Sequence, residues 1–122
     1  MLKKKAIFEI EKLNKFRLNN INNKDIVAYA LNRKIAIYNS YYYGSKDTLN
    51  LIKDIGKEIF TLEDKITNKE IIAYTKNELA NIEDYKGDKS KAIKMYEEAL
   101  DYAKQNNLLN PEIDISYNLA LI

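Results

Sequence analysis

Two ten-residue segments of this chain are nearly the same. Residues 23–32 read NKDIVAYALN and residues 68–77 read NKEIIAYTKN, with six identical positions and two further matched pairs, Asp/Glu and Val/Ile. The beginning of the segment recurs within residues 108–113, LLNPEI, so the steps between copies are 45 and 42 residues (71 − 26 and 113 − 71). Self-similarity at such a period is typical of arrays in which one small unit stacks on the next. The sequence therefore predicts a repeat architecture.

Each copy begins as a helix would begin. Asn23, Asn68 and Asn110 are each followed two residues later by an acidic residue. An Asn at the N-cap accepts a hydrogen bond from a backbone amide, and an acid in the first turn faces the positive end of the helix dipole. Pro111 at the first helical position agrees with this interpretation. We expect helices to begin near residues 24, 69 and 111.

Each of these helices is predicted to be the first of an antiparallel pair. Gly44 and Gly87 can adopt the left-handed conformation that ends a helix. Ser45 or Asp47, and later Asp88, can cap the helices that follow. Apolar residues then recur every three or four positions and predict a core-facing stripe, which consists of Ala92, Ile93, Tyr96, Ala99, Leu100 and Ala103.

The N-terminal segment resembles a second helix of such a pair. Residues 3–14, KKKAIFEIEKLN, align with residues 89–100, KSKAIKMYEEAL, so that Ala6 corresponds to Ala92. The predicted fold is all-α, with antiparallel helix pairs stacked as an α-solenoid of about six helices in a single domain, 1–122. The predicted helices are 3–19, 24–43, 47–61, 69–86, 89–106 and 112–122. They group into a half repeat (1–19), a repeat (23–61), a second repeat (68–106) and a half repeat (111–122).

Composition narrows the class of protein. The 122 residues, 46% of them apolar, suffice for one core, and 20 basic against 18 acidic residues leave a net charge of only +2. We expect no direct nucleic-acid partner and no membrane partner. Glu9 and Glu11 interrupt the first apolar run before it reaches the length of a signal peptide. Without cysteine the chain suits a reducing compartment, so the expected localisation is cytoplasmic.

Catalysis is disfavoured by the residue types present. The chain contains neither His nor Cys, which excludes thiolate nucleophiles, His-assisted nucleophiles and the usual zinc ligand sets. Its three glycines lie far apart, so no phosphate-binding Gly-rich loop exists. We therefore expect no enzymatic activity, no metal and no cofactor.

One segment resembles a known repeat family. Residues 87–100, GDKSKAIKMYEEAL, resemble the turn and second helix of a tetratricopeptide repeat. The pair Leu79-Ala80 stands where that family's first helix carries a Leu-Gly or Leu-Ala pair, and Leu119-Ala120 follows 40 residues later (119 − 79). The resemblance implies a protein-binding scaffold, expected to be bacterial, in which helix pairs present a concave binding face.

The repeat also departs from the family in three respects. Lys76 stands where a large apolar residue is usual, and Glu83 stands where an aromatic residue is usual. Steps of 40 to 45 residues exceed the usual 34 and are similar to the longer repeats of Rap/PlcR/Rgg-type cytosolic peptide-pheromone receptors of low-GC bacteria. Residues 47–61 do not register on the motif, so a HEAT-like helix pair remains an alternative there.

A polar strip on the helix 69–86 is the candidate binding surface. At about 100° per residue, Tyr74, Asn77, Asn81 and Asp84 share one side of this helix, opposite Ile72, Leu79 and Ile82, and we expect that side to be exposed. In the resembled family, residues at these positions and at Tyr85 face a bound peptide, and the repeat places Tyr29 and Asn32 at the positions of Tyr74 and Asn77. The alternative is that the strip is only a solvated helix face.

Two functions remain open. The chain can be a peptide- or protein-binding module, such as the sensor part of a peptide-responsive regulator, or a structural repeat module that self-assembles without a small ligand. The second interpretation rests on apolar residues at the two ends of the array, which predict a homo-oligomer or a longer array. The expected interface comprises Ile7, Ile10, Leu13, Leu119, Leu121 and Ile122.

Overall fold

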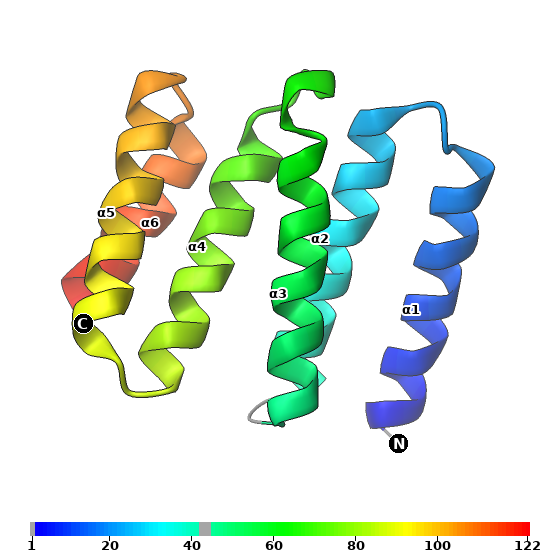
Figure 1. Ribbon diagram of the computed structural model, residues 1–122, viewed down its shortest axis with the longest axis horizontal. Helices are drawn as coiled ribbons and strands as arrows, with labels where there is room; N and C mark the ends of the chain where they lie inside the picture. The colour runs from blue at the N-terminus through cyan, green and yellow to red at the C-terminus, as the bar shows by residue number, and fades with distance from the viewer. Residues whose placement is uncertain (1, 42–44) are drawn as a thin grey trace. The chain divides into compact units, whose positions relative to one another are not determined.

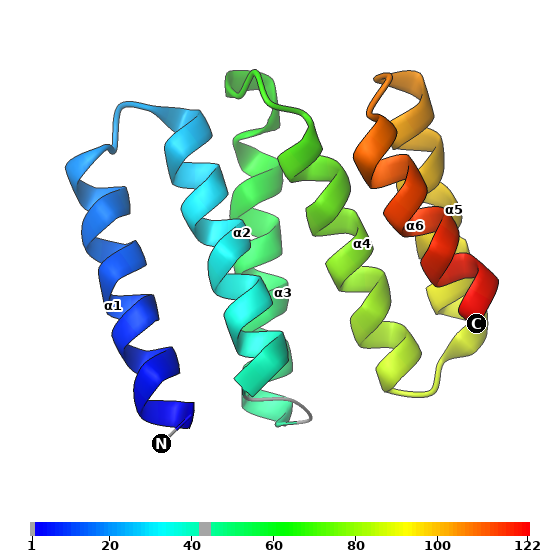
Figure 2. The same ribbon diagram turned by 180° about the vertical axis from the view of Figure 1, so that it is seen from behind.

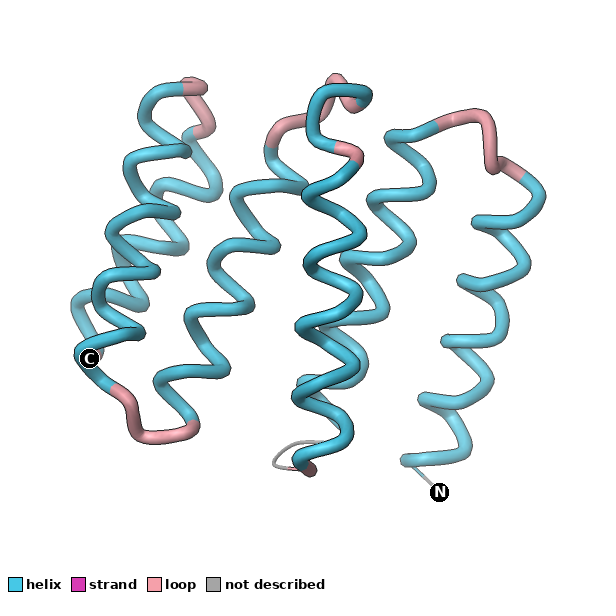
Figure 3. Tube along the Cα trace, in the orientation of Figure 1, coloured by secondary structure: helices cyan, strands magenta, loops and turns pink. Residues whose placement is uncertain are grey.

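The fold is all-α, as the sequence predicts. A computed structural model describes residues 2–41 and 45–122, and within these ranges it contains six α-helices and one short 3-10 helix but no strand (Figures 1 and 3). The helices are α1 (Leu2–Asn19), α2 (Lys24–Tyr41), α3 (Lys46–Thr61), η1 (Glu63–Lys65), α4 (Glu70–Tyr85), α5 (Lys89–Gln105) and α6 (Leu109–Leu121). The six predicted helices are therefore confirmed, with ends that move by up to three residues.

The chain divides into two compact units, residues 1–67 and residues 68–122. In unit 1, α2 packs against both α1 and α3. In unit 2, α5 packs against both α4 and α6, and α4 also touches α6, so these helices form a three-helix group. Figure 2 shows α6 in front of α5, with α4 as the next helix beside them. The predicted single solenoid that would span both units stays a prediction.

Side-chain caps begin α2, α3 and α5 where the sequence places them. Asn23 Oδ1 accepts a hydrogen bond from the backbone amide of Ile26 (3.2 Å). The predicted cap of α4 is wrong by one residue, because Lys69 is its N-cap; Asn68 Oδ1 accepts a hydrogen bond from the Glu70 amide (3.1 Å) from just before the cap. Ser45, rather than Asp47, caps α3. Asp88 caps α5, because its carboxylate accepts from the backbone amide of Lys91. These caps satisfy amides that have no partner within the helix.

The predicted cap of α6 is also wrong. The helix begins at Leu109, with Leu108 at the N-cap, so Asn110 and Pro111 both lie inside its first turn. Pro111 is tolerated there because amides of the first turn have no intrahelical acceptor in any case. Asn107 turns the chain into this start with a positive φ of 57°.

The turn between α4 and α5 follows the prediction. Gly87 has a φ of 90°, in the left-handed region that glycine adopts without steric cost. The backbone amide of Asp88 donates a hydrogen bond to the backbone carbonyl of Glu83 (3.0 Å), and the Asp88 side chain caps α5. The Glu83 side chain is only 3% exposed and pairs with Lys86 (3.6 Å) and Lys91 (3.5 Å). The predicted helix end at Gly44 lies outside the described residues.

Each unit contains its own buried residues. In unit 2 one cluster joins all three helices and consists of Ala73, Ala80, Ala92, Tyr96, Ala99, Ala103 and Ile115. The predicted stripe on α5 supplies four of these, while Ile93 and Leu100 are half-buried. Small residues allow the helices to approach closely, so the cluster fixes the positions of α4 and α6 on α5. In unit 1, Asp25 accepts hydrogen bonds from the amide and hydroxyl of Thr67 and so ties the end of the unit to α2.

Candidate functional site

The predicted strip on α4 lies against α6 within unit 2. Tyr74, Asn81 and Asp84 are half-buried, and Asn77 is only 7% exposed. The expectation that all four side chains would be exposed is therefore wrong for Asn77. The reason is that α6 crosses beside this face of α4, which a helical projection of α4 alone does not include.

Three asparagines meet where the two helices touch. Asn118 Nδ2 on α6 donates to Asn77 Oδ1 (3.0 Å) and to Asn81 Oδ1 (3.5 Å) on α4. The hydroxyl of Tyr96 on α5 also donates to Asn81 Oδ1. We call Asn77, Asn81 and Asn118 the asparagine cluster. It connects polar groups of all three helices of unit 2.

The asparagine cluster keeps unused hydrogen-bonding groups. Each Asn amide offers an acceptor oxygen and a donor nitrogen. The acceptors of Asn77 and Asn81 are occupied, but their Nδ2 donors, like the Oδ1 acceptor of Asn118, have no partner among the described residues. The cluster therefore keeps two donor nitrogens and one acceptor oxygen without a partner among the described residues.

A tyrosine and two acidic residues border the cluster. The Tyr74 hydroxyl bonds with Asp114 of α6, and burial first, then the charges of Asp114 and Glu70, raise the pKa of Tyr74. At the other end of α4, Asp84 pairs with Lys89, and Tyr85 is 44% exposed. The acids nearest the cluster are thus already engaged within the unit.

Tyr96 connects the asparagine cluster to the core of unit 2. Its ring belongs to the core, and burial, followed by the charges of Asp84 and Glu78, raises the pKa of its hydroxyl to about 12. A tyrosine is protonated at neutral pH even when exposed, and burial extends this range to higher pH because the negatively charged phenolate would be poorly solvated. The Tyr96 hydroxyl therefore remains a donor that orients the Asn81 side chain.

The two remaining predicted peptide-binding residues lie on α2 in unit 1. Tyr29 is 52% exposed, and Asn32 is half-buried. They are at the positions that the repeat predicts, one turn apart on α2. Their participation in a common site with the asparagine cluster stays a prediction.

The predicted interface residues differ in exposure. Ile7 is 49% exposed, Leu121 is 68% exposed and Ile122 is 36% exposed. Ile10, Leu13 and Leu119 are half-buried, and Leu119 packs against the core of unit 2. The exposed apolar surface of α6 is broader than predicted, because Leu109, Ile113 and Tyr117 are exposed as well.

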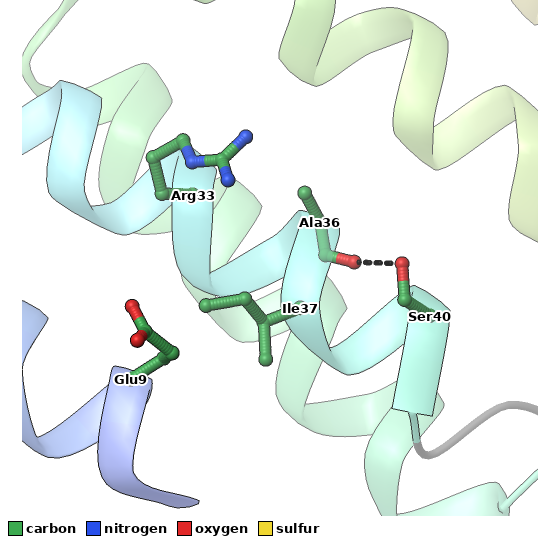
Figure 4. Close-up of a pocket in the computed structure, with 5 residues that line it drawn as sticks. All are labelled: Glu9, Arg33, Ala36, Ile37 and Ser40. Atoms are coloured by element: carbon green, nitrogen blue, oxygen red, sulfur yellow. Dashed lines mark hydrogen bonds between the residues drawn. The ribbon is translucent and has the colours of Figure 1, made fainter. Parts of the chain in front are cut away.

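Two open clefts lie among the described residues of unit 1. The first has a volume of about 330 Å³ and is lined by Glu9 of α1 and by Arg33, Ala36, Ile37 and Ser40 on successive turns of α2 (Figure 4). The second, of about 320 Å³, lies beside Arg17, Lys24 and Glu58.

The charged groups that line the second cleft bond to neighbouring groups. Arg17 Nη1 lies 3.5 Å from Glu58 Oε1, and the Lys24 ammonium donates to the backbone carbonyl of Ile21 (3.0 Å). Arg17 and Glu58 also act on Lys34: burial lowers the pKa of Lys34, Arg17 lowers it further, and Glu58 opposes the change.

Neither metal ligation nor membrane insertion is indicated by the part of the chain that the structure describes. No group of three or more acidic side chains in residues 2–41 and 45–122 is arranged to hold a metal ion. Over the same ranges, no helix has the length and apolar character to cross a bilayer.

Comparisons with models of known protein families, with curated proteins and with solved structures found no match to this chain. Support for the candidate site therefore comes from the geometry of its residues. Sequence reasoning missed Asn118 and assigned Tyr96 to the core alone. When Leu119-Ala120 is aligned with Leu79-Ala80, Asn118 aligns with Glu78. The repeat therefore gave no sequence signal for a third asparagine.

Proposed function

We propose that this chain is a non-catalytic protein-interaction module that binds an extended peptide segment of a partner along the α4–α6 face of unit 2. The observation that carries the proposal is the asparagine cluster, with its two free donors and one free acceptor. Such an arrangement suits a partner that itself presents both donors and acceptors.

A peptide backbone is such a partner. Every peptide group, except before proline, offers one carbonyl acceptor and one amide donor. Asn77 and Asn81 lie one helical turn apart, so their Nδ2 groups can donate to carbonyls of one extended segment while Asn118 accepts from its amide. Recognition of the backbone tolerates varied side chains, and Tyr74 and Tyr85 can add apolar contact area.

The sequence supports the same proposal from two other directions. The tetratricopeptide resemblance predicts that the first helix of each pair faces a bound peptide, and α4 is the first helix of its pair. The absence of His and Cys disfavours catalysis. The finer expectation, a sensor for a peptide-responsive regulator in the bacterial cytoplasm, belongs to this proposal.

Selection from a library of random peptides displayed on phage tests the proposal. Peptides that bind the wild-type chain are synthesised and titrated by calorimetry into the wild type and into the Asn77→Ala/Asn81→Ala variant. We expect the variant to lose about 1–3 kcal/mol of binding free energy, because each truncation removes a hydrogen bond to the peptide backbone.

The control carries the same substitution at two exposed asparagines of unit 1, Asn19→Ala/Asn50→Ala. Its affinity for the selected peptides should equal that of the wild type. Thermal unfolding of both variants is recorded in parallel, because Asn81 also accepts from Tyr96. Selected peptides that bind the folded Asn77→Ala/Asn81→Ala variant as tightly as the wild type would place the site elsewhere.

A further inference from the structure

Helix α6 presents an apolar stripe to solvent. Four large side chains at four-residue spacing form it, each between 56% and 68% exposed: Leu109, Ile113, Tyr117 and Leu121. Ser116 and Ala120 lie beside them and are exposed too. The opposite side of α6 is buried in unit 2 through Ile115. A helix that is apolar on both sides is ordinarily covered on both.

Helix α4 shows what covers the corresponding face. The Leu79-Ala80 and Leu119-Ala120 register (119 − 79 = 40) places Ile113, Tyr117 and Ala120 at the positions of Ala73, Asn77 and Ala80. Those three residues of α4 are 0%, 7% and 0% exposed, and both alanines belong to the cluster with α5 and α6. The stripe on α6 therefore corresponds to the face of α4 that packs against the next two helices, α5 and α6.

A cleft in unit 1 corresponds to the surface that receives α4. The alignment of α1 with α5 places Glu9 at Met95, and the repeat steps of 45 and 40 place Arg33 at Asn118. In unit 2, Met95 packs against the core and Asn118 bonds directly to α4. Glu9 and Arg33 line the α1–α2 cleft (Figure 4), so this cleft lies where α4 would lie.

We propose that α6 of one copy of this chain docks into the α1–α2 cleft of a second copy, as α4 docks against α5 and α6 within unit 2. Tyr117 then lies at Arg33, whose guanidinium can stack on the ring. Asp114 of the docked helix then meets Tyr29 of the second copy. This contact repeats the Tyr74–Asp114 contact of unit 2, with the tyrosine and the aspartate exchanged between the two sides. The inference does not depend on the proposed peptide site, because Asn118 lies outside the stripe.

The charges of the two helices favour this partner. Helix α1 carries six basic and two acidic side chains, a net charge of +4, whereas α6 carries two acids and no base, a net charge of −2. Two copies of α6 would repel each other, while α6 and α1 attract. A helix of a second copy therefore matches the cleft in repeat register and in charge.

Sedimentation equilibrium across a dilution series of the whole chain tests the proposal. The wild type should self-associate, and Ile113→Lys on the stripe or Arg33→Glu in the cleft should each raise the dissociation constant at least tenfold. Ile21→Lys is the matched control, because Ile21 is as exposed as Ile113 (54% against 56%) but lies outside both surfaces. Ser40→Arg, at an exposed position of the same cleft, is a second cleft variant.

A mixing experiment separates this geometry from pairing of two α6 helices. Equal amounts of the Ile113→Lys and Arg33→Glu chains should form a heterodimer, because the second supplies an intact α6 and the first an intact cleft. Circular dichroism verifies that each variant is folded. A wild type that stays monomeric at 100 micromolar, cleft variants that associate as the wild type does, or a mixture that remains monomeric would each overturn the proposal.

Discussion

Tyr96 combines two roles that usually belong to different residues. Its ring is 2% exposed within the unit 2 core, and its hydroxyl donates to Asn81 at the edge of the proposed site. A buried hydroxyl without a partner would cost free energy, so the bond to Asn81 is part of the stability of the unit. The same bond orients one of the three asparagines proposed to bind peptide.

The raised pKa of Tyr96 gives a measurable pH dependence. In the unfolded chain the phenol titrates near pH 10, and in the folded chain near 12. Stability contributed by the protonated phenol is therefore fully present below pH 10 and is lost as the pH rises towards 12. Tyr96→Phe should lower the unfolding free energy by about 0.5–1.5 kcal/mol at pH 8, and this deficit should shrink by pH 11.

Urea unfolding followed by circular dichroism at pH 8, 10 and 11 measures the deficit. Tyr117→Phe is the control, because Tyr117 is 64% exposed and has no core contact to lose. A Tyr96→Phe deficit that stays constant between pH 8 and pH 11 would contradict the assigned environment of the hydroxyl.

Helix α5 organises unit 2 through small side chains. Ala92, Ala99 and Ala103 are fully buried and let the neighbouring helices approach its backbone. The two departures from the tetratricopeptide pattern on α4 are also accommodated by α5. The Lys76 ammonium lies 5.4 Å from the centre of the Tyr102 ring, and Glu83 pairs with Lys91.

Enlarging one of these alanines should strain the helix packing. Ala99→Leu adds three carbons at a fully buried position of the core cluster, so we expect a loss of about 1–3 kcal/mol of unfolding free energy. Glu98→Leu makes the neighbouring change at an exposed position of the same helix and should have little effect. Equal thermal midpoints for Ala99→Leu and the wild type would show that α5 is packed in another register.

At the scale of the whole molecule, the three-helix core of unit 2 is complete within residues 68–122. Its buried cluster runs from Ala73 to Ile115, and Asn68, which bonds to the first amide of α4, and Asp88, which caps α5, lie in the same segment. Domains of about 55–65 residues can fold alone when they have such a core.

We therefore expect the fragment 68–122 to fold by itself. Its far-ultraviolet circular dichroism should be helical, with a cooperative thermal transition. Ala99→Leu should destabilise the fragment and the whole chain by similar amounts, because the altered contact lies within the unit. A fragment that is unfolded at 25 °C, where the whole chain is folded, would show that unit 2 depends on residues 1–67.

The sequence by itself determined the six helices and the caps of α2 and α5. Local rules suffice for these features: an N-cap such as Asn23 or Asp88 bonds to an amide three residues away, and Gly87 ends a helix through its own backbone conformation. The repeat also assigned Ala92 and Ala99 to the core, because their spacing alone places them on one helix face.

Only the tertiary structure decided which polar residues meet. Asn77 was predicted on an exposed face, but it is only 7% exposed, and Asn118, 41 residues away, bonds to its side-chain oxygen. The same crossing of α4 and α6 leaves Ile113 and Tyr117 exposed, although both are apolar. A helical projection gives the direction of each side chain around its own axis. It cannot give the neighbour found in that direction, since this depends on how the helices pack together.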